Sequence, residues 1–244
     1  MKRLTAMLLA LACLCGCAPA LPARHLLNEG VSERGAAAFA GEGDHVGSRY
    51  YVTNDFYNMK SGGGLHLLPA FAAYQQTEEY SCACACALMV LRYFGQTAYD
   101  EAELCRLAGT DTEAGTTPAQ LAALFEELGW QVDCHTGSDA AFAGPEDWRA
   151  YLVEQLDGGT PVLVDWVDWG GHWQVVIGVD DCGTESVWDD VLIFADPYDV
   201  TDHCQDGYYT FPLGRFFSMW KEGSGDGVQP YVTARPRHLL LSHL

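Results

Sequence analysis

Four side chains of this sequence could together support chemistry at a nucleophilic thiol. Such a thiol must be held as a thiolate, stand beside a base that a third group orients, and face donors for the developing oxyanion. Cys82 is the candidate nucleophile and His172 the candidate base. Asp196 can orient the imidazole, and Gln76, six residues before the cysteine, can donate to an oxyanion together with the backbone N–H of Cys82. Each residue alone has an ordinary structural explanation, so the hypothesis depends on the combination.

The elements expected around these residues would place them at chain positions suited to that chemistry. Cys82 opens a segment rich in Ala, Leu and Met that ends at Gly95, which predicts a buried helix over 82–94. The N-terminus of a helix favours a negative charge and therefore a thiolate. His172 follows two glycines at the mouth of a predicted strand over 173–179, and Asp196 follows a predicted strand over 191–195.

The remaining pattern predicts an α+β fold in which helices come first and an antiparallel sheet follows. The expected elements are listed here in chain order: helices over 100–107, 118–128 and 147–156, and strands over 130–134 and 161–166 besides those already named. Thr117 and Pro118 supply a cap and a first-turn proline for the helix over 118–128.

The chain is expected to divide into four parts. Residues 1–17 read as a signal peptide, 18–67 as a flexible stalk, 68–215 as the folded domain and 216–244 as a C-terminal extension. Within the stalk, Tyr50–Val52 is the one strand-like piece, and Ser61–Gly64 reads as a flexible hinge.

The N-terminus has the features of a secretory signal. Lys2 and Arg3 precede an apolar run over 4–14, which is too short to span a bilayer as a helix. The string from Leu14 to Cys17 resembles a bacterial lipobox, which predicts lipidation of Cys17 and a cell-surface lipoprotein. The alternative is cleavage after Ala20 by an ordinary signal peptidase, which would release a soluble secreted protein. Either route predicts export.

Composition excludes some partners and leaves the thiols open. The sequence has 33 acidic and 13 basic residues, so binding to nucleic acid or to an anionic membrane surface is not expected, and membrane contact is expected only through the lipid. Seven cysteines follow the signal region, an odd number that permits three disulfides and one free thiol. Sequence does not decide which of the following are bridged: Cys84, Cys86, Cys105, Cys134, Cys182 and Cys204.

Together the four residues and their surroundings resemble a known family. The segment from Gln76 to Gly95 reads QTEEYSCACACALMVLRYFG and resembles the papain-like bacteriocin-leader (double-glycine) peptidases and their free-standing relatives. Residues 115–128 look like the second signature of that family, in which Gly-Thr-(Ser/Thr)-Pro begins a helix. His172 and Asp196 fall where the family has its His-aromatic-x-Val-Val and Asp-Pro elements. The resemblance covers about residues 68–215.

The resemblance implies a papain-like cysteine peptidase without a cofactor, acting on a peptide or protein substrate. Cys82 would attack, His172 would carry the proton, and a thioester would be hydrolysed, with Asp196 and Gln76 as orienting and oxyanion residues. Ala83 and Cys84 replace the glycine and small residue that usually follow the nucleophile. A catalytically inactive papain-like binding lipoprotein therefore stays open as an alternative, as does a cell-wall peptide amidase or transglutaminase-like acyl transferase.

Two further alternatives concern neighbouring residues. A zinc site could draw on Cys82, Cys84 and Cys86 with His135, His203 or another cysteine, although i, i+2 side chains on a helix point apart. The tryptophans Trp166, Trp169 and Trp173, beside His172, could wall a substrate cleft or belong to the core, which is the commoner outcome.

Overall fold

Helices α2 to α5 form in the order that the sequence predicts. The computed structural model describes residues 24–28, 30–39, 50–137, 139–202, 204–223 and 228–237. The α-helices are α2 (Cys82–Tyr93), α3 (Glu101–Ala108), α4 (Pro118–Glu127), α5 (Pro145–Asp157) and α6 (Leu213–Gly223), with short 3-10 turns η1 (Ala36–Phe39) and η2 (Asp168–Gly170). Every residue of α2 from Ala83 to Leu91 is buried, so this helix is apolar all round and lies inside the molecule.

Local sequence explains where the helices around α2 begin. The Asp100 side chain accepts from the backbone N–H of Glu103 at 2.8 Å and caps α3. Thr117 and Gln120 form a reciprocal capping box at the start of α4, with Pro118 in the first turn. Helix α5 begins at Pro145, two residues before the predicted start, because a first-turn proline needs no N–H partner.

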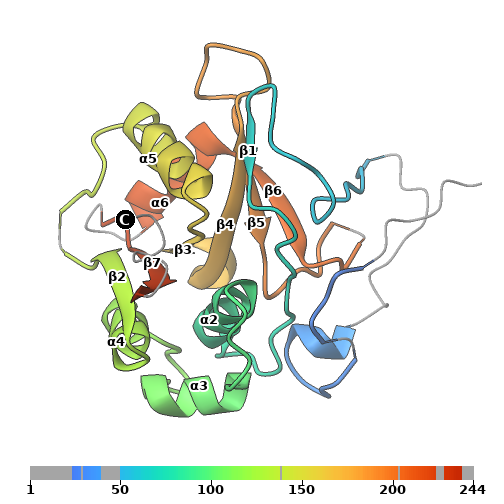
Figure 1. Cartoon of the computed structure of the whole chain (residues 1–244), viewed down its shortest axis with the longest axis vertical. Helices are drawn as coiled ribbons and strands as arrows, with labels where there is room; N and C mark the ends of the chain where they lie inside the picture. Colours follow the sequence, from blue (N-terminus) through green and yellow to red (C-terminus); the bar gives the residue numbers. More distant parts are fainter. Residues whose placement is uncertain are drawn as a thin grey trace, which may run out of the picture.

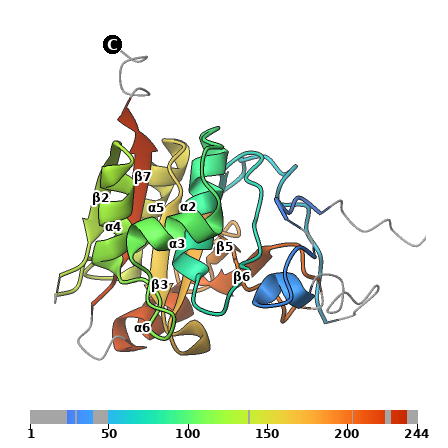
Figure 2. The same ribbon diagram turned by 90° about the horizontal axis from the view of Figure 1, so that it is seen from below.

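The strands form one sheet in which every pair is antiparallel. The strands are β1 (Leu65–Leu67), β2 (Trp130–His135), β3 (Val162–Trp166), β4 (His172–Asp180), β5 (Val191–Ala195), β6 (Tyr208–Pro212) and β7 (Tyr231–Pro236). Their order is β2-β7-β3-β4-β5-β6, and β1 pairs with β4 beyond the end of β3. Figure 2 shows α2, α3 and α4 on one side of this sheet and α6 on the other.

The sheet order places the candidate catalytic residues on neighbouring strands. His172 is the first residue of β4, and Asp196 directly follows the last residue of β5. Val175 lies opposite Ala195 in the β4–β5 ladder, which brings Asp196 to the level of the first residues of β4. Figure 1 shows α2 beside the lower end of β4. The predicted α+β class, with helices packed on an antiparallel sheet, is confirmed.

The structure differs from the predicted stalk over residues 18–67. We refer to residues 24–28 and 30–39 as the N-terminal strap, since they pack along residues 73–78 of the domain (Figure 1). The backbone N–H of Leu27 donates to the carbonyl of Ala73 at 2.8 Å, and the Asn28 side chain both accepts from and donates to the backbone of Gln75. Backbone pairing of this kind leaves no periodic trace in the sequence, which is why a linker was expected here.

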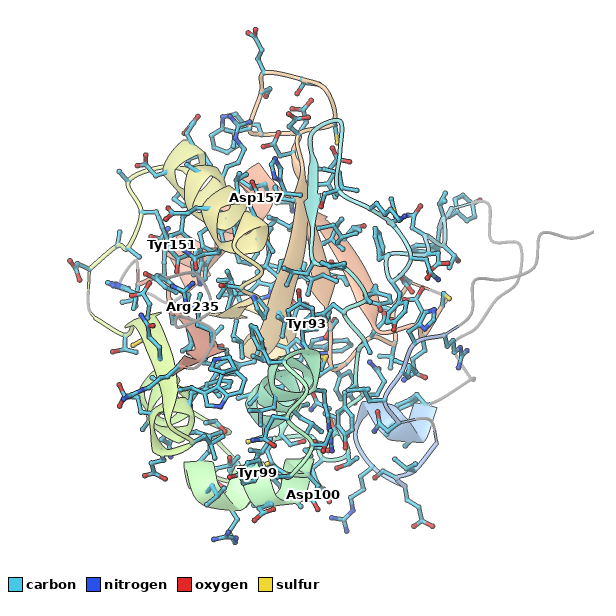
Figure 3. The ribbon with its side chains drawn as sticks, in the orientation of Figure 1. Tyr93, Tyr99, Asp100, Tyr151, Asp157 and Arg235 are labelled. Carbon is cyan, nitrogen blue, oxygen red and sulfur yellow. The ribbon has the colours of Figure 1, made fainter. Side chains whose placement is uncertain are left out.

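Two smaller predictions within that stretch are wrong. Tyr50–Val52 forms no strand and is exposed. Ser61–Gly64 is a closed turn rather than a hinge, because Gly62 bridges Leu65 and the Ser61 hydroxyl donates to the carbonyl of Leu67. The turn leads into β1, beside which Asp157 at the end of α5 lies 2.7 Å from Nδ1 of His66 (Figure 3).

The C-terminal boundary also differs from the prediction of an extension over 216–244. Helix α6 and strand β7 belong to the domain, and β7 lies between β2 and β3. Val232 and Ala234 on β7 are fully buried. The Gly-rich stretch before β7 led to the prediction of an extension, whereas five of the six residues of the strand itself are buried.

Several predictions fall on residues that the structure leaves undescribed. The signal segment and Cys17 lie outside the described residues, as does His203. Within the described ranges, no helix has the length and apolar character needed to cross a membrane. The seven cysteines from Cys82 onward are all free thiols.

Candidate active site

The N-terminus of α2 brings a thiol and unpaired backbone donors to the same place. Cys82 is the first residue of the helix, and its side chain is half-buried. Ser81 makes no side-chain cap, so the first N–H groups of the helix have no capping partner. These N–H groups and the helix dipole favour a negative charge at this end, as a thiolate or an oxyanion requires.

His172 joins this thiol to Asp196. The Nε2–H of His172 donates to Oδ1 of Asp196 at 2.8 Å, and both side chains are almost fully buried. The Cys82 thiol is close enough to the imidazole to raise the pKa of His172, and Nδ1 is the ring nitrogen that Asp196 leaves free for it. Burial lowers the pKa of His172, but the charge and hydrogen bond of Asp196, together with Cys82, outweigh burial and raise it to about 10. The site thus favours the imidazolium.

Gln174 fixes Asp196 and was missed in the sequence analysis. Its Nε2 donates to Oδ2 of Asp196 at 2.9 Å, while its Oε1 accepts from the indole N–H of Trp166 at 2.6 Å. Gln174 is fully buried. Its signal in the sequence is its spacing: His172 and Gln174 are two residues apart on a strand and therefore share a face, a polar pair in an otherwise apolar run.

Gln76 is buried close to the site, with its amide turned toward its own loop. Its Nε2 donates to the carbonyl of Glu78 at 2.8 Å and to that of Glu79 at 3.3 Å. Its Oε1 is buried without a hydrogen-bond partner among the described residues. The structure shows no contact between this amide and Cys82. The backbone N–H of Gln76 donates to the carbonyl of Pro197 at 2.9 Å, which ties the loop to the residue after Asp196.

Glu101 organises the loop that leads to Cys82 and was also missed in the sequence analysis. Its carboxylate is buried and accepts from the Tyr74 hydroxyl at 2.9 Å and from the backbone N–H and hydroxyl of Thr77 at 3.0 and 2.6 Å. It accepts from the Ser81 hydroxyl as well. A buried carboxylate needs such donors. The sequence offered a weak signal, since an acidic residue in the first turn of α3 also suits the helix dipole.

The two cysteines that follow Cys82 on α2 point elsewhere. The thiol of Cys84 lies 3.3 Å from the Thr110 hydroxyl, and the neighbouring Cys105 is the main influence that lowers its pKa. The thiol of Cys86 donates to the carbonyl of Trp173 at 3.3 Å, and burial raises its pKa well above the ordinary range. No group of three or more potential ligands in the described part of the chain is arranged to hold a metal ion. The zinc alternative therefore finds no support there.

The cysteine of α2 and the His–Asp pair of the sheet define a class, the papain-like cysteine peptidases. Sequence gives the particular family: the model described as "Peptidase_C39 like family" matches residues 69–227. That span is more than half of the chain, so this protein belongs to the Peptidase_C39-like family. No curated protein matches the chain.

The solved structures that are similar to this chain in backbone arrangement share little sequence identity with it. The peptidase domain of Streptococcus ComA, a bi-functional ABC transporter involved in a quorum sensing pathway, is 20% identical with a TM-score of 0.47, over 68% of this chain and 99% of that one. A double glycine motif protease from an AMS/PCAT transporter in complex with the leader peptide is 16% identical with a TM-score of 0.44, over 71% and 95%. UfSP from C. elegans is 14% identical with a TM-score of 0.45, over 74% and 35%. The family assignment rests on the sequence match.

Proposed function

We propose that this peptidase hydrolyses peptide or amide bonds through a thioester, with Cys82 as nucleophile, His172 as general base and acid, and Asp196 as the orienting residue. The observation that carries the proposal is the arrangement at the N-terminus of α2, where Cys82 interacts with His172 and the other ring nitrogen of His172 is hydrogen-bonded to Asp196. Ala83, which replaces the usual glycine after the nucleophile, is fully buried in the core, and this supports the proposal that its methyl group lies outside the substrate site.

The steps follow from the positions of these groups. The Cys82 thiolate attacks the substrate carbonyl carbon, and the carbonyl oxygen becomes an oxyanion that accepts from the backbone N–H of Cys82. The imidazolium of His172 gives its proton to the leaving amine as the C–N bond breaks, which leaves a thioester. His172 then takes a proton from water, the hydroxide adds to the thioester carbonyl, and the thiolate leaves.

Gln76 is proposed as the second oxyanion donor. Its amide nitrogen carries two hydrogens, and the bond to Glu79 at 3.3 Å is the longer of its two contacts. An oxyanion, being charged, forms a stronger hydrogen bond than a neutral carbonyl and can replace this longer contact. The apolar run over 4–14 and the lipobox ending at Cys17 support the further proposal of an exported lipoprotein.

Selective alkylation tests the catalytic pair. Limiting iodoacetamide at mildly acidic pH, followed by mass mapping, should label Cys82 in the wild type and lose that label in His172→Ala. Cys134 and Cys182 are internal references, because both are exposed. Burial and the neighbouring carboxylates raise the pKa of both thiols, so they should react only in alkali.

Label on the two reference cysteines without preference for Cys82 would contradict the peptidase mechanism and favour a binding protein. Selective labelling justifies a screen of fluorogenic peptides, with Cys82→Ser as the inactive control. For export, Cys17→Ala should move the protein from the membrane fraction to the soluble fraction. A wild-type N-terminus after Ala20 would instead establish release by signal peptidase.

A further inference from the structure

Three side chains form a continuous wall beside His172. Glu79 comes from the loop before Cys82, Trp169 from η2 just before His172, and Tyr198 from the residues just after Asp196. The Tyr198 hydroxyl donates to the Glu79 carboxylate at 3.1 Å, and its ring lies 5.4 Å from that of Trp169 between centroids. Each of the three segments that carry the predicted catalytic residues thus contributes one member of the wall.

Tyr198 fixes this wall to the catalytic residues. Its backbone N–H donates to Oδ1 of Asp196 at 2.8 Å, the same oxygen that accepts from His172. Its ring stands perpendicular to the imidazole, with centroids 6.5 Å apart. A side chain that lies against the wall would therefore belong to a residue close to the scissile bond.

Trp169 differs from the two other tryptophans near His172. Trp166 and Trp173 are buried in the core, as most tryptophans are, whereas Trp169 is 60% exposed. Its backbone has a φ of 52°, in the left-handed region that bulky residues rarely adopt. Strained residues of this kind concentrate at ligand-binding and active sites. An indole face held at the surface beside the site suits a cation or an alkyl stem.

The negative charge of Glu79 and of the whole chain favours a cationic side chain as the ligand of this wall. The Glu79 side chain is exposed, and among the described residues its carboxylate has a phenol as its polar partner and no cation. The adjacent Glu78, by contrast, pairs with Arg34 at 3.4 Å. The whole chain has a formal net charge of −20, so an approaching basic peptide is attracted and an acidic one repelled.

The geometry points to a substrate subsite formed by Glu79, Trp169 and Tyr198 that binds a lysine or arginine side chain of the peptide. The alkyl stem lies on the indole face, and the charged head reaches the carboxylate of Glu79. This inference deepens the proposed function and rests on it, because it takes the Cys82–His172 pair as the place of cleavage.

Matched substrates test the subsite. Fluorogenic peptides carry either lysine or norleucine, which keeps the alkyl stem and removes the charge, at each of three positions on either side of the scissile bond. At one position the lysine peptide should have a kcat/KM about tenfold higher than the norleucine peptide at low salt, as expected when an exposed ion pair and a cation–π contact act together, and this ratio should fall as ionic strength rises. In Glu79→Gln this ratio should fall toward one. Glu127→Gln, an exposed glutamate on α4, is the matched control and should keep the wild-type ratio.

A wild-type ratio near one at every position, or a ratio unchanged in Glu79→Gln, would overturn the subsite. Binding to Cys82→Ser, measured by calorimetry, separates this failure from that of the proposed function. If no peptide is cleaved but the lysine peptide still binds more tightly than the norleucine peptide, and loses this advantage with Glu79→Gln, the subsite stands and the hydrolysis mechanism fails. If Glu79→Gln does not change the difference in affinity between the lysine and norleucine peptides, the subsite is refuted.

Discussion

The two ring nitrogens of His172 face different partners, and these two partners together set the pKa of the imidazole. Nε2 is held by Asp196, which in turn is held by Gln174, so the ring orientation is set from inside the sheet. Nδ1 is left for the thiol. Because the carboxylate and the thiol together outweigh burial, the folded protein binds the proton of His172 more tightly than the unfolded chain does.

This difference predicts a pH-dependent contribution of His172 to stability. The pKa of His172 is raised from about 6.5 in the unfolded chain to about 10 in the fold. Its contribution to the free energy of unfolding is therefore fully present below about pH 6.5 and is lost as the pH rises through about 10. Urea unfolding under reducing conditions should show a gap between wild type and His172→Gln that narrows steadily over that range.

His66→Gln is the control for this experiment, because His66 also pairs with an aspartate but at the surface, where such pairs contribute about 0–1 kcal/mol. A gap for His172→Gln that stays constant from about pH 6 to pH 10 would show that the imidazolium is not the stabilised form in the fold.

The reacting residues of the site were more predictable from the sequence than the residues that hold them in position. Cys82, His172 and Asp196 stand at element ends, and the glycine before His172 and the proline after Asp196 are visible in the sequence. Gln174 and Glu101 act through buried hydrogen bonds to residues 22 and 24 positions away, and their local signals are weak: a two-residue spacing from His172 and a place in the first turn of α3. Gln76 was predicted as a donor, but the loop carbonyls that engage its amide could not be foreseen, because loop conformation depends on the packing around it.

At the scale of elements, the loop over 75–81 is held from three directions. The N-terminal strap lies along one side of the loop. The carboxylate of Glu101 in α3 accepts hydrogen bonds from hydroxyl groups of the loop, and the carbonyl of Pro197 accepts one from the backbone N–H of Gln76. Helix starts were predictable because capping residues mark them in the sequence, as Asp100 and Thr117 do. The strap was not predictable, since most of its hydrogen bonds go to backbone groups of residues 73–77, which any sequence possesses.

The close approach of the strap to this loop gives a sharp test of its importance. Gly35 has a φ of +57°, and a Cβ built there would lie 2.5 Å from the carbonyl oxygen of Gln76 and 2.8 Å from the backbone N of Glu78. Gly35→Ala should therefore push the strap and loop apart. We expect a loss of about 1–3 kcal/mol from overpacking, together with slower alkylation of Cys82.

Gly63→Ala provides the comparison, because Gly63 has a similar φ of +64° but open space around the added Cβ. It should show the backbone strain alone, with the alkylation rate of Cys82 unchanged. Equal effects of the two substitutions on Cys82 would mean that the strap does not position the loop.

At the scale of the whole molecule, the chain returns at its C-terminal end to complete the sheet. Strand β7 pairs with β2 on one side and β3 on the other, so it joins the part of the sheet next to α4 to the part that carries the site. Such non-local pairing is the aspect of the fold that sequence patterns convey least, and it explains why a domain end at residue 215 was predicted.

Truncation distinguishes the two boundaries. Deletion of residues 228–244 should abolish the cooperative thermal transition, because it removes a buried strand and leaves β2 and β3 with unpaired edges. Deletion of residues 238–244 alone should leave the melting temperature within a few degrees of the wild type. A cooperative transition in the longer truncation would place β7 outside the folding unit.

The strap also determines how far the catalytic site can reach. The strap begins at Arg24, so a lipid on Cys17 would be joined to it only through residues 18–23. Six extended residues span at most about 22 Å, whereas a free stalk over 18–67 would extend well beyond 100 Å. A lipidated form would therefore work within one domain's breadth of the bilayer and meet substrates that reside at that surface or pass through it.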